Sequence, residues 1–229
     1  MIRNLKVLAL ALVAVFAMSA VAASMAFADS FTSESSPVQL TGKQVGEGDT
    51  FTTEVGTVKC KEVTYKATAA TPTTTITATP TYPEKTTGGV QNCTGFGFPA
   101  KVETNGCRYL FHVGAATTGT LDIVCDPEKE ITVAATSVGV TKCIVHVPAQ
   151  TNKGVVTYKN TGSLTTREVE VEANITGLTY TWTKGTGLGA CTVAEKAEGE
   201  SSTGSYTGKA LITGEKDNGG TEHVGIFLS

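Results

Sequence analysis

Three histidines are the residues of this chain best suited to metal binding or proton transfer. His112, His146 and His223 each lie in a segment with the alternation of a β-strand. Apolar residues flank the first two on both sides, whereas Glu222 and Val224 flank His223. A histidine in such a position points to the face opposite those neighbours. The three segments are far apart, and none has the i, i+2 or HExxH-type spacing of a local zinc site. We therefore expect three surface histidines and no metal site.

A group of carboxylates could bind calcium or act as an acid/base pair. It consists of Asp122, Asp126, Glu128 and Glu130. Calcium loops place oxygen ligands at alternating loop positions, whereas two of these four residues fall in predicted strands. We expect a solvated turn. The Asn-Gly-Gly sequence at 218–220, after Asp217, likewise predicts the turn between the last two strands.

The sequence lacks the motifs that mark common catalytic sites. It contains no Gly-x-Ser-x-Gly elbow, Ser-x-x-Lys pair, Gly-rich phosphate loop or candidate catalytic cysteine. Glycosidase carboxylates leave no local signature, so this observation favours a non-enzyme without excluding an enzyme. Tyr180 and Trp182 alternate on one face of a strand and could form a platform for stacking sugars. They are the only candidate binding residues, with packing in the core as the alternative that we favour, and no cofactor is expected.

The first 28 residues have the pattern of an export signal. Arg3 and Lys6 give a positive start, residues 7–18 form an apolar run, and Ala-Phe-Ala at 26–28 is a cleavage pattern before Asp29. No cysteine follows the cut, so lipid anchoring is not expected. No later segment is long and apolar enough to span a bilayer. We predict a mature chain from about Asp29 that is released outside the cell.

The cysteines predict three disulfides. The closest two of the six, Cys93 and Cys107, are fourteen residues apart, and an even number in an exported chain favours disulfides. Residues 107–125 resemble a hairpin that turns at 114–119, with Tyr109 near Ile123 and Phe111 near Leu121. Its two end cysteines then lie opposite each other at bridging distance. We predict Cys107–Cys125 from this geometry, and Cys60–Cys93 and Cys143–Cys191 as sequential neighbours.

Composition predicts an all-β protein. Forty residues are Thr and 25 are Gly; Thr and Val fit a pleated surface, and Gly supplies turns. Without Arg3 and Lys6 the chain keeps 16 basic against 21 acidic residues, a net charge of −5. Binding to nucleic acid needs a clustered positive surface, so nucleic acid is not an expected partner.

Alternating apolar and polar residues predict many short strands. The clearest is 168–175, with Val169 and Val171 facing in and Glu170 facing water. Residues 75–82 also alternate, and Pro80 indicates an edge strand there. The other predicted strands begin near Val38 and cover 51–54, 56–60, 62–68, 130–135, 139–147, 154–159, 178–183, 206–213 and 222–228.

Two local matches suggest an internal duplication. VGTVKC at 55–60 resembles VGVTKC at 138–143, and TGFG at 94–97 resembles TGLG at 186–189. They favour a division near Thr136. We predict an antiparallel β-sandwich type of fold with two small modules in tandem, 29–136 and 137–229, stabilised by disulfides.

Longer stretches resemble a recurring set of bacterial secreted proteins. The resemblance is carried by CTGFGFPAKVETNGCRY at 93–109, GVTKCIVHVPAQTNKGVVTYKNTG at 139–162, SYTGKALITG at 205–214 and the terminal VGIFLS. These Thr- and Gly-rich, disulfide-containing β proteins occur as expanded paralogues with no assigned activity. The resemblance implies an exported β protein. It transfers no catalytic or binding residue, because the similar stretches are strand, turn and cysteine positions.

Together these features predict a secreted, non-catalytic structural or binding module of the extracellular space. Its expected role is adhesion or carbohydrate interaction, with a protein or a polysaccharide as the partner. One alternative is a carrier whose strands close around a cavity for a small ligand. The other is a secreted hydrolase, which would need carboxylates or histidines that converge in one cleft.

Overall fold

The computed structural model describes residues 29–115, 117–163, 166–185, 191, 199–216 and 222–229. Within these ranges the chain forms strands and no helix. The strands are β1 (Phe31–Ser33), β2 (Val38–Gln44), β3 (Asp49–Thr53), β4 (Gly56–Cys60), β5 (Thr64–Ala69), β6 (Thr75–Thr81), β7 (Cys93–Gly95), β8 (Phe98–Glu103), β9 (Arg108–Val113), β10 (Thr118–Val124), β11 (Ile131–Ser137), β12 (Val140–Val147), β13 (Gln150–Thr161), β14 (Glu168–Lys184), β15 (Gly199–Lys216) and β16 (Ile226–Leu228). All their pairings are antiparallel, which confirms the predicted all-β class. The predicted export signal, the turn at 217–220 and the repeat at 186–189 lie outside the described residues.

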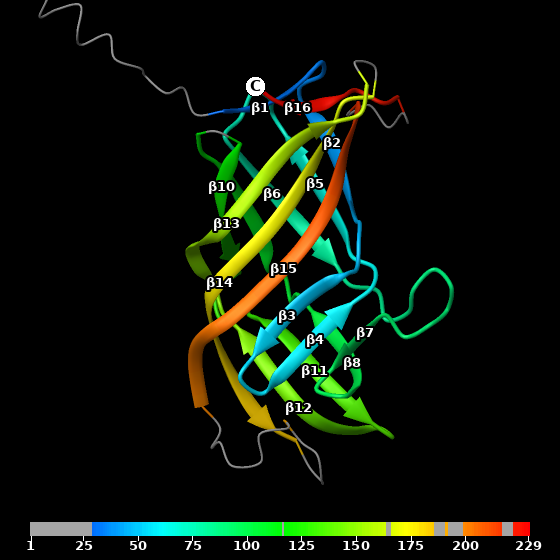
Figure 1. Ribbon diagram of the computed structural model, residues 1–229, viewed down its shortest axis with the longest axis vertical. Coiled ribbons are helices and arrows are strands. Elements are labelled where there is room, and N and C mark those ends of the chain that lie inside the picture. Colours follow the sequence, from blue (N-terminus) through cyan, green and yellow to red (C-terminus); the bar gives the residue numbers. More distant parts are fainter. Residues whose placement is uncertain (1–28, 116, 164–165, 186–190, 192–198, 217–221) are drawn as a thin grey trace, which may run out of the picture.

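The strands close into a circuit that the long β14–β15 pair divides into two rings (Figure 1). The upper ring contains β2, β5, β6, β9, β10 and β13 together with β14 and β15. The lower ring contains β3, β4, β7, β8, β11 and β12 with the same two strands. Each ring thus has eight strands. Such a ring leaves an interior just wide enough for packed side chains or one small ligand.

Successive hairpins alternate between the two rings. The β3–β4, β7–β8 and β11–β12 hairpins belong to the lower ring, and β5–β6 and β9–β10 belong to the upper ring. The division expected near Thr136 therefore falls inside β11, and the chain on either side of it contributes strands to both rings. The match between 55–60 and 138–143 has a local origin. Both segments include the turn of a lower-ring hairpin, where Gly56, Val138 and Gly139 have positive φ.

Strand β14 replaces two predicted strands, 168–175 and 178–183. The sequence indicates a break between Ile175 and Leu178, and Gly177 in this gap has a positive φ of 70°. The break is a β-bulge, because the register with β15 shifts between Thr176 and Leu178 and again before Tyr180. Its first half pairs with β13 and its last residues pair with β12. The bulge therefore lies where the strand passes from the upper to the lower ring.

The prediction of an edge strand at 75–82 is wrong, because β6 lies between two other strands. It pairs with β9 through Thr75–Ala78 and with β5 through Thr79–Thr81, so it has a neighbour on each side. Pro80 is tolerated because it lies beyond the last residue paired with β9 and faces Tyr65 of β5. At that point the ladder needs no N–H from the proline.

The predicted hairpin and disulfides are confirmed. Strands β9 and β10 pair with Tyr109 opposite Ile123 and Phe111 opposite Leu121. The bonds are Cys60–Cys93, Cys107–Cys125 and Cys143–Cys191. The first joins β4 to β7 at a paired position, the second closes the base of the β9–β10 hairpin, and the third ties β12 to the segment after β14.

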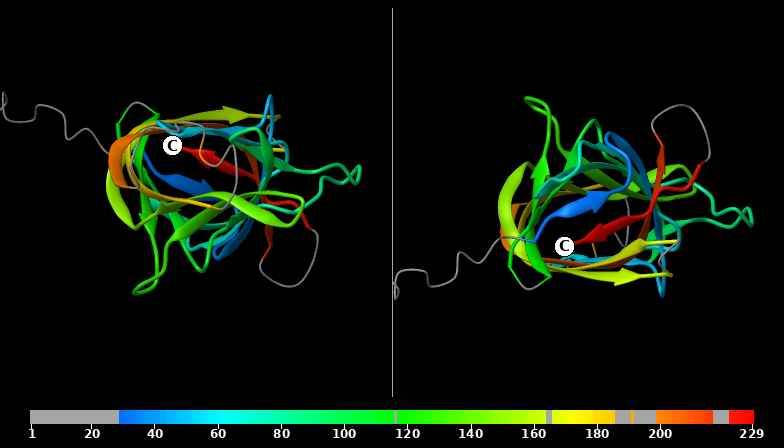
Figure 2. Two further views of the ribbon diagram at one scale, coloured as in Figure 1. Left: turned by 90° about the horizontal axis from the view of Figure 1, so that it is seen from below. Right: turned by 90° about the horizontal axis from the view of Figure 1, so that it is seen from above.

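A short terminal ribbon of β1 and β16 crosses the open end of the upper ring (Figure 2). We call it the cap. Asn160 of β13 holds the cap, since its Nδ2 donates to the Leu228 carbonyl at 2.8 Å and its Oδ1 accepts from the Leu228 N–H at 2.7 Å. Phe31 of the cap exchanges two backbone hydrogen bonds with Thr73. Arg167 lies over the Phe227 ring, 4.4 Å from its centroid. The upper ring is therefore covered at this end.

Candidate functional site: the ring interiors

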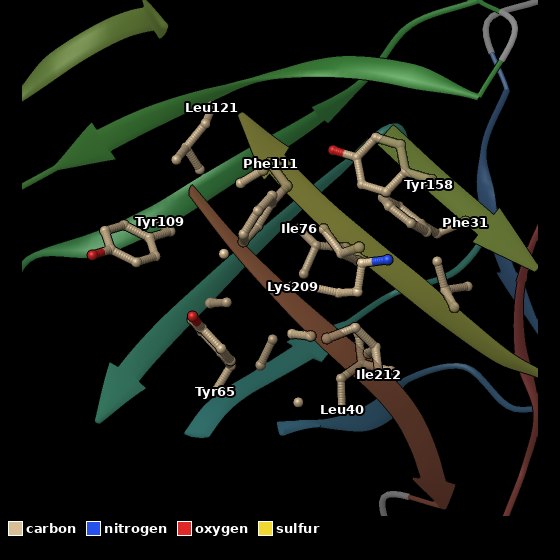
Figure 3. Close-up of a pocket in the computed structure, with 18 of the residues that line it drawn as sticks. Phe31, Leu40, Tyr65, Ile76, Tyr109, Phe111, Leu121, Tyr158, Lys209 and Ile212 are labelled. Carbon is tan, nitrogen blue, oxygen red and sulfur yellow. The ribbon is translucent and has the colours of Figure 1, made fainter. Parts of the chain in front are cut away.

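The interior of the upper ring contains an apolar cavity of about 60 Å³, which we call the upper cavity (Figure 3). All eight strands of the ring contribute to its lining, as do Phe31 and Ile226 of the cap. The other lining residues are Leu40, Gly42, Tyr65, Lys66, Ala67, Ile76, Ala78, Tyr109, Phe111, Leu121, Tyr158, Val169, Val171, Ala173, Tyr206, Gly208, Lys209, Ala210 and Ile212. The rings of Phe31 and Tyr158 meet edge to face, 5.2 Å apart between centroids. The cap therefore contacts the lining directly.

A lower cavity, also of about 60 Å³, lies beside the first, inside the lower ring. The two cavities share Tyr109, Leu121 and Tyr206 as lining residues. The lower cavity is otherwise lined mainly by apolar residues of the lower ring and of the β14 bulge, with the exception of Asp49 and Tyr82. Asp49 and tyrosine hydroxyls are thus the polar groups of a mainly apolar lining.

A buried carboxylate and four tyrosine hydroxyls form this polar group, which we call the Asp49 cluster. Asp49 is 3% exposed. Its Oδ2 accepts hydrogen bonds from the hydroxyls of Tyr206 at 2.6 Å and Tyr65 at 2.8 Å. The hydroxyls of Tyr82 and Tyr109 bond to each other at 2.9 Å. Among the residues that the structure describes, Asp49 Oδ1 has no hydrogen-bond partner.

Burial sets the electrostatics of the cluster. It raises the pKa of Asp49, and the hydrogen bonds from Tyr206 and Tyr65 offset only part of this rise. Burial also raises the pKa of Tyr109 to about 12. Burial places the pKa values of Tyr65, Tyr82 and Tyr206 well above the usual range for tyrosine, and the charge of Asp49 raises them further. All four hydroxyls therefore keep their protons at neutral pH and remain donors.

Gly208 makes room for the carboxylate. A Cβ atom at this position would lie 2.5 Å from Asp49 Oδ1 and 2.7 Å from the Tyr206 hydroxyl. Gly208 also lines the upper cavity. The free carboxylate oxygen consequently packs against the backbone of Gly208, where any side chain on β15 would collide with it.

Sequence reasoning missed the Asp49 cluster. Its members come from β3, β5, β6, β9 and β15 or flank these strands, and only ring closure brings them together. One signal was available in the sequence. Asp49, Phe51 and Thr53 share a strand face, so an acidic residue occupies a position whose neighbours on that face turn inward.

The two candidate aromatic residues lie in the core rather than on a sugar-binding surface. Tyr180 is fully buried and Trp182 is 5% exposed. The Tyr180 hydroxyl accepts a hydrogen bond from the backbone N–H of Glu54 at 2.7 Å, and the Tyr180 ring meets Phe51 edge to face. Tyr180 and Trp182 do share a face, as predicted, but that face points into the lower ring, so neither ring can stack on a sugar at the surface.

The histidines and carboxylates are partly or fully exposed, and two of the histidines lie in separate pairs with a carboxylate. His112 Nε2 is 2.9 Å from Asp122 Oδ2, and His146 Nδ1 is 2.6 Å from Glu130 Oε1. His223 is exposed. Partial burial would raise the pKa of Asp122, but the backbone N–H of Asn152 and the His112 side chain outweigh it and lower that pKa. Asp126 pairs with Arg108 at 3.3 Å, and the four carboxylates therefore do not converge.

No known protein family, curated protein or solved structure matches the chain. In the described ranges, no group of three or more His, Cys, Asp or Glu side chains is placed to hold a metal ion. Within the same ranges no helix is suited to crossing a membrane. The ring interiors are therefore the candidate functional site.

Proposed function

We propose that the protein is a secreted, non-catalytic module that binds a small, mainly apolar molecule inside its rings. The observation that carries this proposal is the upper cavity, to which all eight strands and the cap contribute. Ligand sites in proteins are concave and mostly apolar, with a few placed polar groups. The upper cavity and the Asp49 cluster fit that description. Of the functions considered from sequence, the small-ligand carrier thus has the best geometric support.

Secretion belongs to the same proposal. The support is the export pattern of residues 1–28 together with three disulfides, which persist in oxidising compartments. An interior held by disulfides and closed by the cap protects a bound molecule from water. This arrangement suits a carrier that works outside the cell.

The size of the cavities limits the ligand. Each measures about 60 Å³, whereas an engineered apolar cavity that binds benzene measures about 150 Å³. The interior as it stands therefore fits molecules of a few heavy atoms, such as short aliphatic compounds. Larger carrier ligands would require the lining side chains to move.

A cavity-filling substitution tests the proposal with 1-chlorobutane as the probe. Ala78 is buried in β6 and lines the upper cavity, and Thr77 is its exposed neighbour on the same strand. Ala78→Val adds two methyl groups inside the cavity, whereas Thr77→Val changes only the outer face. Such small ligands bind weakly, so protein-observed NMR titration is the suitable measurement.

We expect saturable shifts of cavity-lining signals in the wild type and in Thr77→Val. In Ala78→Val, the affinity should fall at least tenfold, with the fold retained as judged by the NMR spectrum. Absence of saturable binding by the wild type, or equal binding by both variants, contradicts the proposal.

A further inference from the structure

We infer that the bound molecule carries a hydroxyl group, which sits in the Asp49 cluster between Asp49 Oδ1 and the Tyr82–Tyr109 pair. This inference rests on the proposed function, because it concerns a ligand held in the ring interiors. It adds the chemical class, namely a short apolar alcohol or phenol.

The cluster offers one unused acceptor. Asp49 is 3% exposed, and its Oδ1 has no partner among the described side chains and backbone. A buried polar atom without a partner is costly. Asp49 lines the lower cavity, so a molecule bound there lies against this carboxylate.

The cluster also offers one unused donor. The hydroxyls of Tyr65 and Tyr206 both donate to Asp49 Oδ2. Tyr82 and Tyr109 share a single hydrogen bond, which uses the proton of one hydroxyl and the oxygen of the other. The second proton of this pair is used by no hydrogen bond between described residues. Tyr82 and Tyr109 line the lower cavity together with Asp49.

A hydroxyl is the ligand group that satisfies both atoms at once. It donates its proton to Asp49 Oδ1 and accepts the free proton of the tyrosine pair. An ammonium group could only donate, and it would leave the tyrosine proton unused. A carboxylate could only accept, and the charge of Asp49 would repel it. The surrounding walls of Leu121, Ile123 and Leu178 are apolar and favour an uncharged molecule.

A comparison of 1-butanol with 1-chlorobutane tests the inference. The two molecules have similar shapes, but the chlorine donates no hydrogen bond. The quantity measured is the ratio of their dissociation constants, from NMR titration of the wild type and three variants. Asp49→Asn puts an amide N–H where the free acceptor was. Tyr82→Phe with Tyr109→Phe removes both hydroxyls of the pair, so neither is left unpaired.

Tyr158→Phe is the matched control. Tyr158 also lines the upper cavity, but its hydroxyl donates to the backbone carbonyl of His112 at 3.0 Å and lies outside the Asp49 cluster. Its removal should leave the ratio unchanged.

We expect the preference for butanol to fall roughly tenfold in Asp49→Asn and roughly fivefold in the double variant, as the loss of one hydrogen bond predicts. If the wild type binds both probes and neither change alters the ratio, water alone occupies the cluster and the inference is wrong, while the proposed function stands. If the wild type binds neither probe, both fail.

Discussion

At the scale of single residues, Asp49 is the position where the chain departs most from an apolar interior. Two tyrosine hydroxyls satisfy one of its carboxylate oxygens and leave the other free. A buried ionised carboxylate with incomplete pairing opposes folding. A protein whose interior served packing alone would gain stability from an apolar residue at this position, so the carboxylate supports the proposed binding role.

Asp49→Asn should therefore stabilise the protein increasingly as the pH rises. Burial raises the pKa of Asp49 above its usual value of 3.8, so its protonated form favours folding. That contribution is complete below the unfolded pKa and is lost as the pH rises through the folded pKa, by about 1.4 kcal/mol for each unit between the two. Asparagine keeps a carbonyl for the two tyrosines and does not titrate. Urea unfolding from pH 3 to 8 measures the difference.

Asp122→Asn is the control with the opposite sign. The pKa of Asp122 is lowered because the Asn152 N–H and His112 outweigh its partial burial. Its contribution to stability is therefore present above the unfolded pKa and is lost as the pH falls through the folded pKa. This variant should be less stable than the wild type at neutral pH, with the difference vanishing in acid. The explanation of the cluster fails if both variants change with pH in the same direction.

At the scale of elements, the inward face of β14 is the feature that the sequence predicts best. Val169, Ala173 and Ile175 are buried, as the alternation indicates, and Val171 is partly buried beside the upper cavity. Glu172 is exposed and pairs with Lys209 of β15 at 3.0 Å. The two faces of this strand should consequently respond very differently to substitution.

Val169→Asp should destabilise the protein by about 3–5 kcal/mol, because it leaves a buried charge without a partner. Glu172→Gln on the outer face should cost no more than about 1 kcal/mol, since it removes only an exposed ion pair. Chemical denaturation of both variants at pH 7 measures these values. Similar losses in the two variants would refute the assigned faces.

The features that could be predicted from the sequence are those that depend on residues close together in the chain. The register that places Phe111 opposite Leu121 and the Cys107–Cys125 bond follow from one hairpin, so alternation and a turn suffice to find them. The bulge at Gly177 and the two neighbours of β6 depend on distant strands, and local propensity therefore indicated a break and an edge instead. Asp49 meets Tyr206 only across 157 residues of sequence, which no local pattern reveals.

At the scale of the whole molecule, the shared pair β14–β15 makes the two rings depend on each other. Both strands run from one ring into the other, and the hairpins that complete each ring alternate along the chain. Neither ring can therefore be removed without opening the other. This organisation favours one cooperative unit, in which the two rings unfold together.

Trp182→Ala tests this dependence from the lower ring. Trp182 is 5% exposed and lies at the end of β14 that pairs with β12, so its truncation should cost about 3–5 kcal/mol. If the rings unfold together, the slowest-exchanging amides of β9 and β10 in the upper ring should lose the same free energy of protection as those of β11 and β12. Hydrogen exchange followed by NMR measures both sets. Thr183→Ala, at the exposed neighbour of Trp182, should change neither set by more than about 0.5 kcal/mol. Loss of protection confined to β11 and β12 would mean that the rings unfold separately, despite their common strands.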